Sequence, residues 1–187
     1  MRVIAGEAKG HHLVAPDHPA TRPLTDRARE GIFSALGGLV ADAVVLDLYA
    51  GSGSIGIEAL SRGAARAVFV ENNRKALAAL RANLAAVGFW MLAEVATQKV
   101  AEYLKGATSI YRLIFFDPPW SMPTSEVGRE MAMASMLVGP GGEIVVHRRY
   151  PDPLPLLPPG WHGAGAYRYG DTVLYRVAAP SLAGTAK

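Results

Sequence analysis

Short apolar stretches alternate with helix-like stretches through most of this 187-residue sequence. Strands are indicated at residues 43–48, 67–70, 89–98, 112–116, 143–147 and 172–177. Helices are indicated at residues 26–36, 55–62 and 126–138, and where Leu77, Leu80, Leu84 and Val87 recur at helical spacing before Gly88. This alternation predicts a parallel, doubly wound α/β sheet, in which ligands bind beyond the carboxyl ends of the strands.

The two ends of the sequence depart from this alternation. Two short apolar stretches near the N-terminus, separated by a turn with two glycines, indicate a hairpin before the first helix, for which Thr25 is a good N-cap. Residues 139–142 indicate a turn, and five prolines exclude regular structure at residues 151–160. We therefore expect three parts: an extension at residues 1–40, one α/β domain at 41–178 and a flexible tail at 179–187.

A glycine-rich turn follows the strand at residues 43–48. Gly51, Gly53 and Gly56 have the spacing G-x-G-x-x-G, which permits a tight turn, a close approach of the backbone to a ligand, and a helix start. The pattern fits a dinucleotide site, a methyl-donor site or a plain strand-to-helix turn. Asp47, at the strand end and aimed at the loop, favours a cationic ligand over a pyrophosphate. S-adenosylmethionine carries an ammonium and a sulfonium and no phosphate.

An acidic residue closes the next strand. Glu71 follows the glycine loop by about 20 positions, a place from which a carboxylate accepts hydrogen bonds from ribose hydroxyls. Both a nicotinamide-dependent enzyme and a methyltransferase need such a group. Alternatively, Glu71 is a solvated carboxylate that caps the following helix, a role that Asn72 or Asn73 could fill instead. Glu71 thus indicates an adenosine ligand without choosing between the two enzymes.

The sequence Asp117-Pro118-Pro119-Trp120 ends the strand at residues 112–116. Two prolines hold the chain extended and so fix where the Asp117 carboxylate and the Pro118 carbonyl point. Two acceptors of this kind suit an exocyclic amine on a flat base, because they stabilise the positive charge that develops on its nitrogen. Trp120 would stack on the extruded base. The alternative is a strand-ending turn with a core tryptophan.

Composition excludes several classes of function. The sequence has no cysteine, which rules out disulfide scaffolds, iron–sulfur clusters, thiolate zinc sites and cysteine nucleophiles. Its five histidines lack metal-ligand spacing, so we expect no metal. We expect no membrane span and no signal peptide, and hence a cytoplasmic protein. The net charge of +3 permits a nucleic-acid partner without demanding one.

These motifs resemble those of the class I S-adenosylmethionine-dependent methyltransferases, a Rossmann-like fold whose amino-directed members carry an Asp/Asn-Pro-Pro-aromatic motif. More narrowly, the sequence is similar to bacterial enzymes that methylate the exocyclic N2 amine of one guanine in 16S ribosomal RNA. The similarity extends over nearly the whole chain. Its most specific part is the N-terminal stretch from Arg22 to Glu30. Other matching segments are residues 2–6, 46–53, 58–64, 69–71 and 169–172, with Asn83 and residues 117–120.

The resemblance implies a seven-stranded, mostly parallel sheet with the last strand antiparallel. It implies Asp117, Pro118 and Trp120 as the catalytic residues that hold the guanine amine. It places Asp47, Gly51 and Gly53 around the methionine part of the donor and Glu71 on its ribose. Other donor-binding residues implied are Tyr49, Ser52, Asn72, Lys99, Val100 and Asp117. Lys99 stands where the family often has an acidic or amide residue, so we assign no adenine recognition to its side chain.

The resemblance also implies a partner, 16S ribosomal RNA within the assembled or nearly assembled small subunit, and a monomeric enzyme. RNA contacts would come from Lys9, Arg22, Thr25 and Arg29. Charged residues near the end of the strand at 143–147 (His147, Arg148 and Arg149) are taken as a solvated basic spot. Three alternatives stay open: a methyltransferase acting on a DNA adenine or a protein glutamine, a nicotinamide oxidoreductase, and a non-catalytic RNA-binding subunit.

Overall fold

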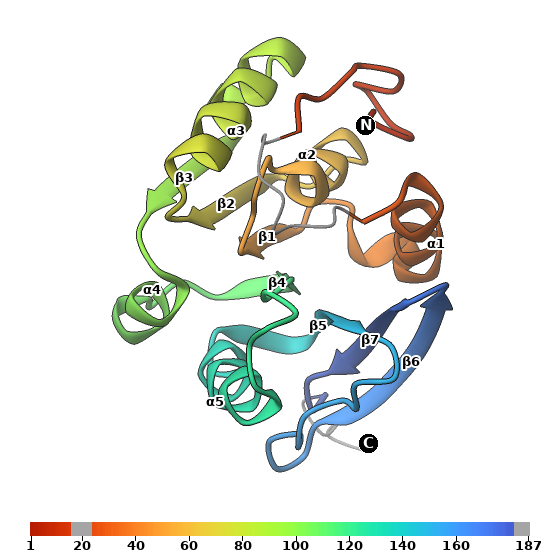
Figure 1. The fold of residues 1–187 in the computed structure, drawn as a ribbon, viewed down its shortest axis with the longest axis vertical. Helices are drawn as coiled ribbons and strands as arrows, with labels where there is room; N and C mark the ends of the chain where they lie inside the picture. The colour runs from red at the N-terminus through yellow and green to blue at the C-terminus, as the bar shows by residue number, and fades with distance from the viewer. Residues whose placement is uncertain (16–23, 182–187) are drawn as a thin grey trace, which may run out of the picture.

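A computed structural model, which describes residues 1–15 and 24–181, shows one seven-stranded sheet with helices on both faces (Figure 1). The strands lie in the order β3-β2-β1-β4-β5-β7-β6. Their bounds are Val44–Leu48 (β1), Arg66–Glu71 (β2), Ala93–Thr97 (β3), Tyr111–Phe116 (β4), Val138–Arg149 (β5), His162–Tyr169 (β6) and Thr172–Ala178 (β7). Pairs among β1 to β5 are parallel, and β7 is antiparallel to both β5 and β6. The predicted parallel sheet with an antiparallel last strand is confirmed.

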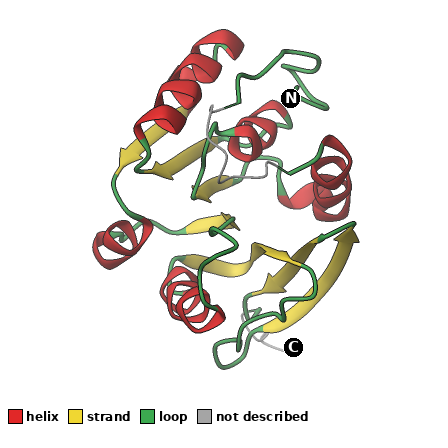
Figure 2. Ribbon diagram, viewed as in Figure 1, coloured by secondary structure: helices red, strands yellow, loops and turns green. Residues whose placement is uncertain are grey.

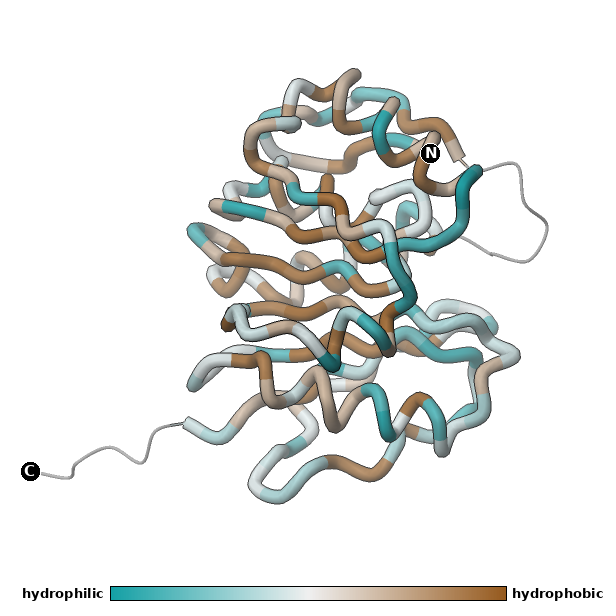
Figure 3. Tube along the Cα trace, turned by 90° about the vertical axis from the view of Figure 1, so that its left-hand side faces the viewer, coloured by the Kyte–Doolittle hydropathy of each residue, from teal (hydrophilic) through white to brown (hydrophobic). Residues whose placement is uncertain are grey.

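The helices form two layers around the sheet (Figure 2). Their bounds are Asp26–Leu36 (α1), Ser54–Ser61 (α2), Arg74–Val87 (α3), Val100–Gly106 (α4) and Thr124–Ser135 (α5). One core cluster joins α1, α2 and α3 to one sheet face, and a second joins α4 and α5 to the other. Alternate strand residues explain this division, because Val45 belongs to the first cluster and Leu46 to the second. Figure 3 shows these hydrophobic strands stacked through the middle of the molecule.

Capping residues fix the helix ends as the sequence predicts. Thr25 caps α1, and its hydroxyl accepts a hydrogen bond from the Ala28 N–H at 3.2 Å. Asn73, rather than Asn72, caps α3 by accepting from the N–H groups of Lys75 and Ala76. Gly88 ends α3 in the left-handed conformation, with φ 75°.

Several predicted elements need correction. Residues 139–142 are not a turn between elements but part of β5, where a register shift between Tyr111 and Leu113 of β4 absorbs the extra residues. The strand expected at 89–98 is limited to β3, preceded by a short 3-10 turn at Trp90–Leu92. The helix α4 and the strand β6 were not predicted from the sequence. Residues 151–160 form neither helix nor strand, as predicted.

The predicted N-terminal hairpin is present, with Arg2 and His12 as antiparallel bridge partners. It docks on α2, since Glu58 accepts from the backbone N–H groups of Ile4 and Ala5 at 2.8 and 3.1 Å. Gly6 lies so close to α2 that a Cβ there would meet the Ser61 carbonyl oxygen at 1.7 Å. The hairpin thus packs into the same core as the rest of the fold.

No helix in the described part of the chain is long and apolar enough to cross a membrane. The part of the predicted tail at residues 182–187, and Arg22, lie outside the described residues.

Candidate active site

The strand register places one group of residues in a row at the carboxyl edge of the sheet. Leu48 of β1 pairs with Val70 of β2 and Phe116 of β4, and Phe116 pairs with Val146 of β5. The residue that follows each of these four therefore lies at the same level of the edge. These four residues are Tyr49, Glu71, Asp117 and His147. The ends of β1, β2 and β4, where the sequence motifs lie, are therefore neighbours, and the end of β5 lies beside them.

The glycine loop wraps tightly over the end of β1. Gly51 and Gly53 have φ values of 57° and 79°, which favour glycine, and Gly53 is the N-cap of α2. A Cβ at Gly53 would lie 2.3 Å from Leu80, so glycine is needed there for space as well as for conformation. Ser52 is buried, and its carbonyl accepts from the Asn83 side chain, which also binds the backbone of Val14. Asn83 therefore ties the glycine loop to the N-terminal segment.

Asp47 lies beneath this loop and does not project into solvent. Its side chain is on the α2 face of β1, where Oδ2 accepts from the Gly56 N–H at 2.9 Å. Oδ1 is buried and has no hydrogen-bond partner among the described residues. Burial raises the pKa of Asp47 well above its usual value, and the nearby Asp117 and Glu71 charges add to this rise. An orphaned, desolvated carboxylate of this kind fits a site that takes a cationic ligand.

Glu71 is held by the backbone around it. Oε2 accepts from the Gly51 N–H, and Oε1 accepts from the N–H groups of Asn72 and Asn73, each at 2.8 Å. A carboxylate has about four acceptor positions, so capacity remains for a hydroxyl of a ligand. Glu71 therefore fixes the glycine loop while it faces a cavity, which suits the predicted contact with a ribose.

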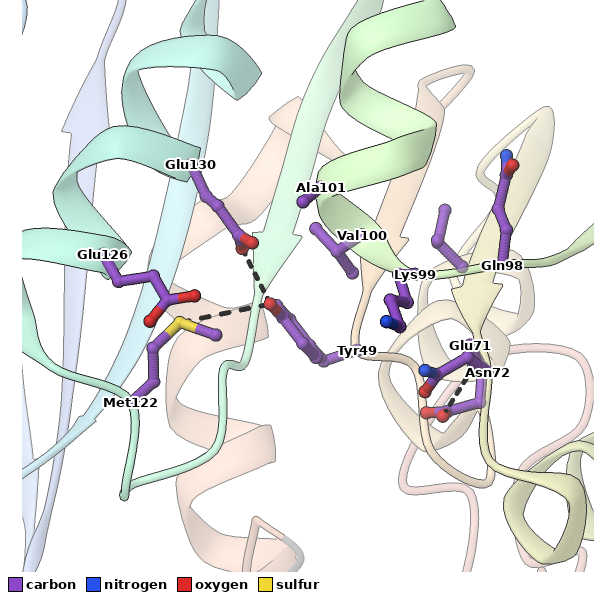
Figure 4. A pocket seen from close by; sticks show the side chains of 11 residues that line it. Tyr49, Glu71, Asn72, Gln98, Lys99, Val100, Ala101, Met122, Glu126 and Glu130 are labelled. Carbon is purple, nitrogen blue, oxygen red and sulfur yellow. Dashed lines mark hydrogen bonds between the residues drawn. The ribbon is translucent and has the colours of Figure 1, made fainter.

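That cavity has a volume of about 240 Å³ and opens between β1, β2, α4 and α5 (Figure 4). Glu71, Asn72, Lys99 and Val100, which were predicted to bind the donor, line one side of this cavity. Tyr49 lies between the two sides of the cavity (Figure 4), and its ring centroid is 5.9 Å from that of Phe116. Five of the ten residues predicted to bind the donor therefore line this cavity. The other five are not among its lining residues: Asp47, Gly51, Ser52, Gly53 and Asp117.

Met122, Glu126 and Glu130, none of which was predicted as a site residue, form the far side of the cavity. The Tyr49 hydroxyl donates to Glu130 Oε2 at 2.7 Å and faces Met122, and Glu126 lies beside them (Figure 4). Burial, the bond to Glu130 and its charge raise the pKa of Tyr49. Burial also raises the pKa of Glu130. Two glutamates on one face of α5 were the available sequence pattern, but nothing in it indicates that they face β1.

Asp117 forms a short pair with a histidine. Its Oδ1 lies 2.5 Å from Nδ1 of His147, because these two residues follow the paired Phe116 and Val146 and point to the same sheet face. The Asp117 side chain is 27% exposed, whereas that of His147 is 3% exposed. The predicted solvated basic spot is therefore wrong for His147 and for Arg148, which is also buried and binds Asp152 at 3.1 Å.

Aromatic and cationic groups adjoin this pair. The Trp120 ring lies edge-on to His147 at 6.1 Å between ring centroids, and the exposed Arg149 guanidinium is 5.8 Å from the Trp120 centroid. Pro118 is buried and Trp120 is partly exposed, so the motif is anchored at one end and open at the other. An amine held at Asp117 would lie next to a flat, accessible ring.

The predicted RNA-binding residues differ in accessibility. Lys9 is exposed in the hairpin, and the Thr25 side chain caps α1. Arg29 is wrong as an RNA contact, because it is fully buried and bonds the Arg2 carbonyl and Asp26. Its position on the inner face of α1 explains this, and burial lowers its pKa despite the charges of Glu58 and Asp26. Among the described residues, no cluster of three or more His, Asp or Glu side chains is placed to hold a metal ion.

Comparisons with known proteins show the family and the fold of this chain. Ribosomal RNA small subunit methyltransferase D of Escherichia coli (strain K12) is 34% identical over 161 residues, which cover 86% of this chain and 81% of that protein. The solved structure of the Escherichia coli protein yhhF has a TM-score of 0.86 at 28% identity, covering 97% and 98% of the two chains.

A more distant structure, an RNA methyltransferase from Salinibacter ruber in complex with S-adenosyl-L-homocysteine, has a TM-score of 0.65 at 20% identity and covers 85% of this chain and 94% of that chain. The predicted Rossmann-like methyltransferase fold is confirmed by these likenesses. The family described as conserved hypothetical protein 95 matches residues 1–178. The chain therefore belongs to the conserved hypothetical protein 95 family and is a relative of ribosomal RNA small subunit methyltransferase D.

Proposed function

We propose that this chain is an S-adenosylmethionine-dependent methyltransferase that methylates the exocyclic N2 amine of a specific guanine in 16S ribosomal RNA. Its substrate is the assembled or nearly assembled small subunit, on which it acts as a cytoplasmic monomer. The observation that supports this most directly is the row of Glu71, Asp117 and His147 at one sheet edge, with Trp120 beside it. A relative named for the small-subunit ribosomal RNA supports the choice of substrate.

The donor side suits S-adenosylmethionine, which supplies a methyl group on a positively charged sulfur. Glu71 keeps acceptor capacity toward the cavity, and the buried Asp47 carboxylate, with its unpartnered Oδ1, favours positive charge near the glycine loop. The charges that raise the pKa of Asp47, after burial, are those of the carboxylates Asp117 and Glu71. These groups bind and orient the donor.

The acceptor side suits an amine on an extruded base. Asp117 and the Pro118 carbonyl accept the two N–H groups of the amine, and Trp120 stacks on the base. The nitrogen lone pair forms the new bond to the methyl carbon, while the electron pair of the carbon–sulfur bond leaves with sulfur. The nitrogen then loses one proton. Positive charge moves to a nitrogen beside Asp117, so positioning and local electrostatics supply most of the rate.

The test is methyl transfer from labelled S-adenosylmethionine to small subunits that lack the modification. Naked 16S RNA, DNA and protein serve as parallel acceptors, and digested RNA is analysed for methylated nucleosides. Guanine methylated on N2, formed with subunits and absent from the other acceptors, is the expected result. Label in a DNA adenine or a protein glutamine would overturn the acceptor, and label on another position of the RNA would overturn the guanine amine.

A further inference from the structure

Four residues lie in a row at the carboxyl edge of the sheet: Tyr49, Glu71, Asp117 and His147. Among these four residues, only His147 is a buried side chain that titrates near neutral pH. Its Nδ1 lies 2.5 Å from Asp117 Oδ1, and its Nε2 lies 3.4 Å from the Thr172 hydroxyl on β7. An ionised carboxylate only accepts, so Nδ1 carries the hydrogen of this bond. The sheet holds the backbone at His147 on both sides, since His147 pairs with Leu174 of β7 and follows Val146, which pairs with β4.

The surroundings of the ring are apolar apart from a few charges. Leu24, Ile32 of α1 and Ile55 of α2 line the small space beside His147, together with Leu174. The charges that act on it are those of Asp117 at the end of β4, Arg148 on β5 and Asp171 before β7. Burial alone would lower the pKa of His147, but the charge and hydrogen bond of Asp117 outweigh it, so the pKa lies above its usual value.

We propose that His147 is a positioning residue for methyl transfer that acts through Asp117: it fixes the orientation of the carboxylate, and its protonation state sets the net charge that faces the acceptor amine. This inference rests on the proposed function. It adds a residue that the sequence motif of the site does not contain, at a position 30 residues after Asp117. With Oδ1 engaged by the ring, Oδ2 of Asp117 is left for the amine.

The net charge of the Asp117–His147 pair should change the rate of methyl transfer. When His147 is neutral, the Asp117–His147 pair carries one negative charge beside the nitrogen that becomes positive. When His147 is protonated, the pair is neutral overall, and its stabilisation of the positive nitrogen is weaker. The same proton also makes the carboxylate a poorer acceptor for the proton that the nitrogen loses. The transfer rate should therefore rise as His147 loses its proton.

A histidine that only supports the fold would behave differently. Its replacement would alter stability and leave the pH dependence of the chemical step unchanged. His147→Asn separates the two roles, because the asparagine amide nitrogen takes the place of Nδ1 and donates to Asp117 without titrating. His147→Ala removes the bond as well. His162, an exposed histidine on β6, provides the matched control as His162→Asn.

The experiment measures the single-turnover rate of methyl transfer to small subunits from about pH 5.5 to about pH 9, a range that spans the usual histidine value near 6.5. The affinity for S-adenosylmethionine is measured at each pH by calorimetry. We expect the rates of the wild type and His162→Asn to rise about tenfold, with a midpoint above the usual histidine value. His147→Asn should stay flat at the level of the wild-type plateau, and His147→Ala should be slow throughout, both with donor affinity within about threefold of wild type.

Ring titration by NMR gives a second measurement that needs no turnover. With S-adenosylhomocysteine bound, the His147 ring should titrate above its usual pKa, and Asp117→Asn should lower that value. The proposal would be overturned if the transfer rate of His147→Asn rose with pH as the wild-type rate does. It would also be overturned if the wild-type rate did not change with pH. Absence of transfer by the wild type at every pH would instead overturn the proposed function, and the inference with it.

Discussion

The two sides of the sheet edge, to which we assign the methyl donor and the acceptor, hold their carboxylates in different ways. On the donor side, backbone N–H groups hold them: Gly51, Asn72 and Asn73 donate to Glu71, and Gly56 donates to Asp47. On the acceptor side, a side chain holds Asp117, namely His147. Backbone N–H groups do not titrate and are present whatever the side chain, whereas the His147 side chain titrates and is lost on substitution. Donor binding should therefore depend on chain geometry, and methyl transfer should depend on particular side chains and on pH.

The largest effect is expected from Asp117→Asn. The amide keeps the size of the side chain but removes the negative charge beside the amine, so the single-turnover rate should fall about 10²- to 10³-fold. Donor affinity, measured by calorimetry, should stay within about threefold, because the donor cavity is bounded by Glu71 and Tyr49. Glu102→Gln, an exposed substitution on α4, is the control. If Asp117→Asn lowered the affinity for the donor as much as it lowered the transfer rate, the donor and acceptor sides would not be separate.

Gly53→Ala should damage the donor side through the backbone. The added Cβ meets Leu80 at 2.3 Å and forces a φ of 79° on alanine, so unfolding free energy should drop by about 3 kcal/mol. Urea unfolding measures this loss, and donor affinity should fall with it. Gly63→Ala, at φ 93° and with open space around the Cβ, should lose only the conformational part, about 1–2 kcal/mol, and keep donor affinity. Equal losses in the two variants would contradict the close packing.

Glu71→Gln should give a smaller effect confined to donor binding. The glutamine side chain has one oxygen and one NH2 group, so an N–H group faces backbone N–H groups that donated to the carboxylate, and those hydrogen bonds are lost. We therefore expect the affinity for S-adenosylmethionine to be about tenfold weaker. At saturating donor, the transfer rate should match the wild type, because Asp117 and His147 are unchanged. A fall in the saturated rate comparable to that of Asp117→Asn would show that the two sides are coupled.

The smallest effect concerns stability. The folded-state pKa of His147 is raised by Asp117 against the opposing effect of burial, so protonation stabilises the folded chain. This contribution is complete below the unfolded-state value near 6.5 and is lost as pH rises through the folded-state pKa. Urea unfolding of the wild type should therefore show stability falling over that window relative to His147→Asn. The opposite slope would contradict the ion pair.

Much of the fold followed from local patterns. Strand and helix alternation, the caps at Thr25 and Asn73 and the glycine turns depend on residues close in sequence, and all are present. The strand β6 was missed because His162–Tyr169 contains glycine and alanine and stays largely exposed at the sheet margin. Residues 139–142 have turn composition, yet a bulge keeps them in β5.

The sequence motifs predicted only those site residues that stand at or just after strand ends. Asp47, Glu71 and Asp117 stand at strand ends, so their proximity follows from a parallel sheet. The partnership of Asp117 with His147 depends on the register between β4 and β5, and periodicity does not give register. Arg29 was expected to contact RNA because the resemblance is most specific in its stretch, but its place on the inner face of α1 buries it against Asp26 and Arg2.

Docking of the N-terminal hairpin on Glu58 has a consequence for synthesis. Ile4 and Ala5 lie 54 and 53 residues before the carboxylate that accepts their N–H groups. At a translation speed of about 5–20 residues per second, that partner is added to the chain about 3–11 seconds later. The hairpin therefore leaves the ribosome with its backbone donors bonded to water, and it settles only after α2 has been made. A synonymous codon change that slows elongation between these two segments should lengthen the time for which the hairpin stays open to proteases.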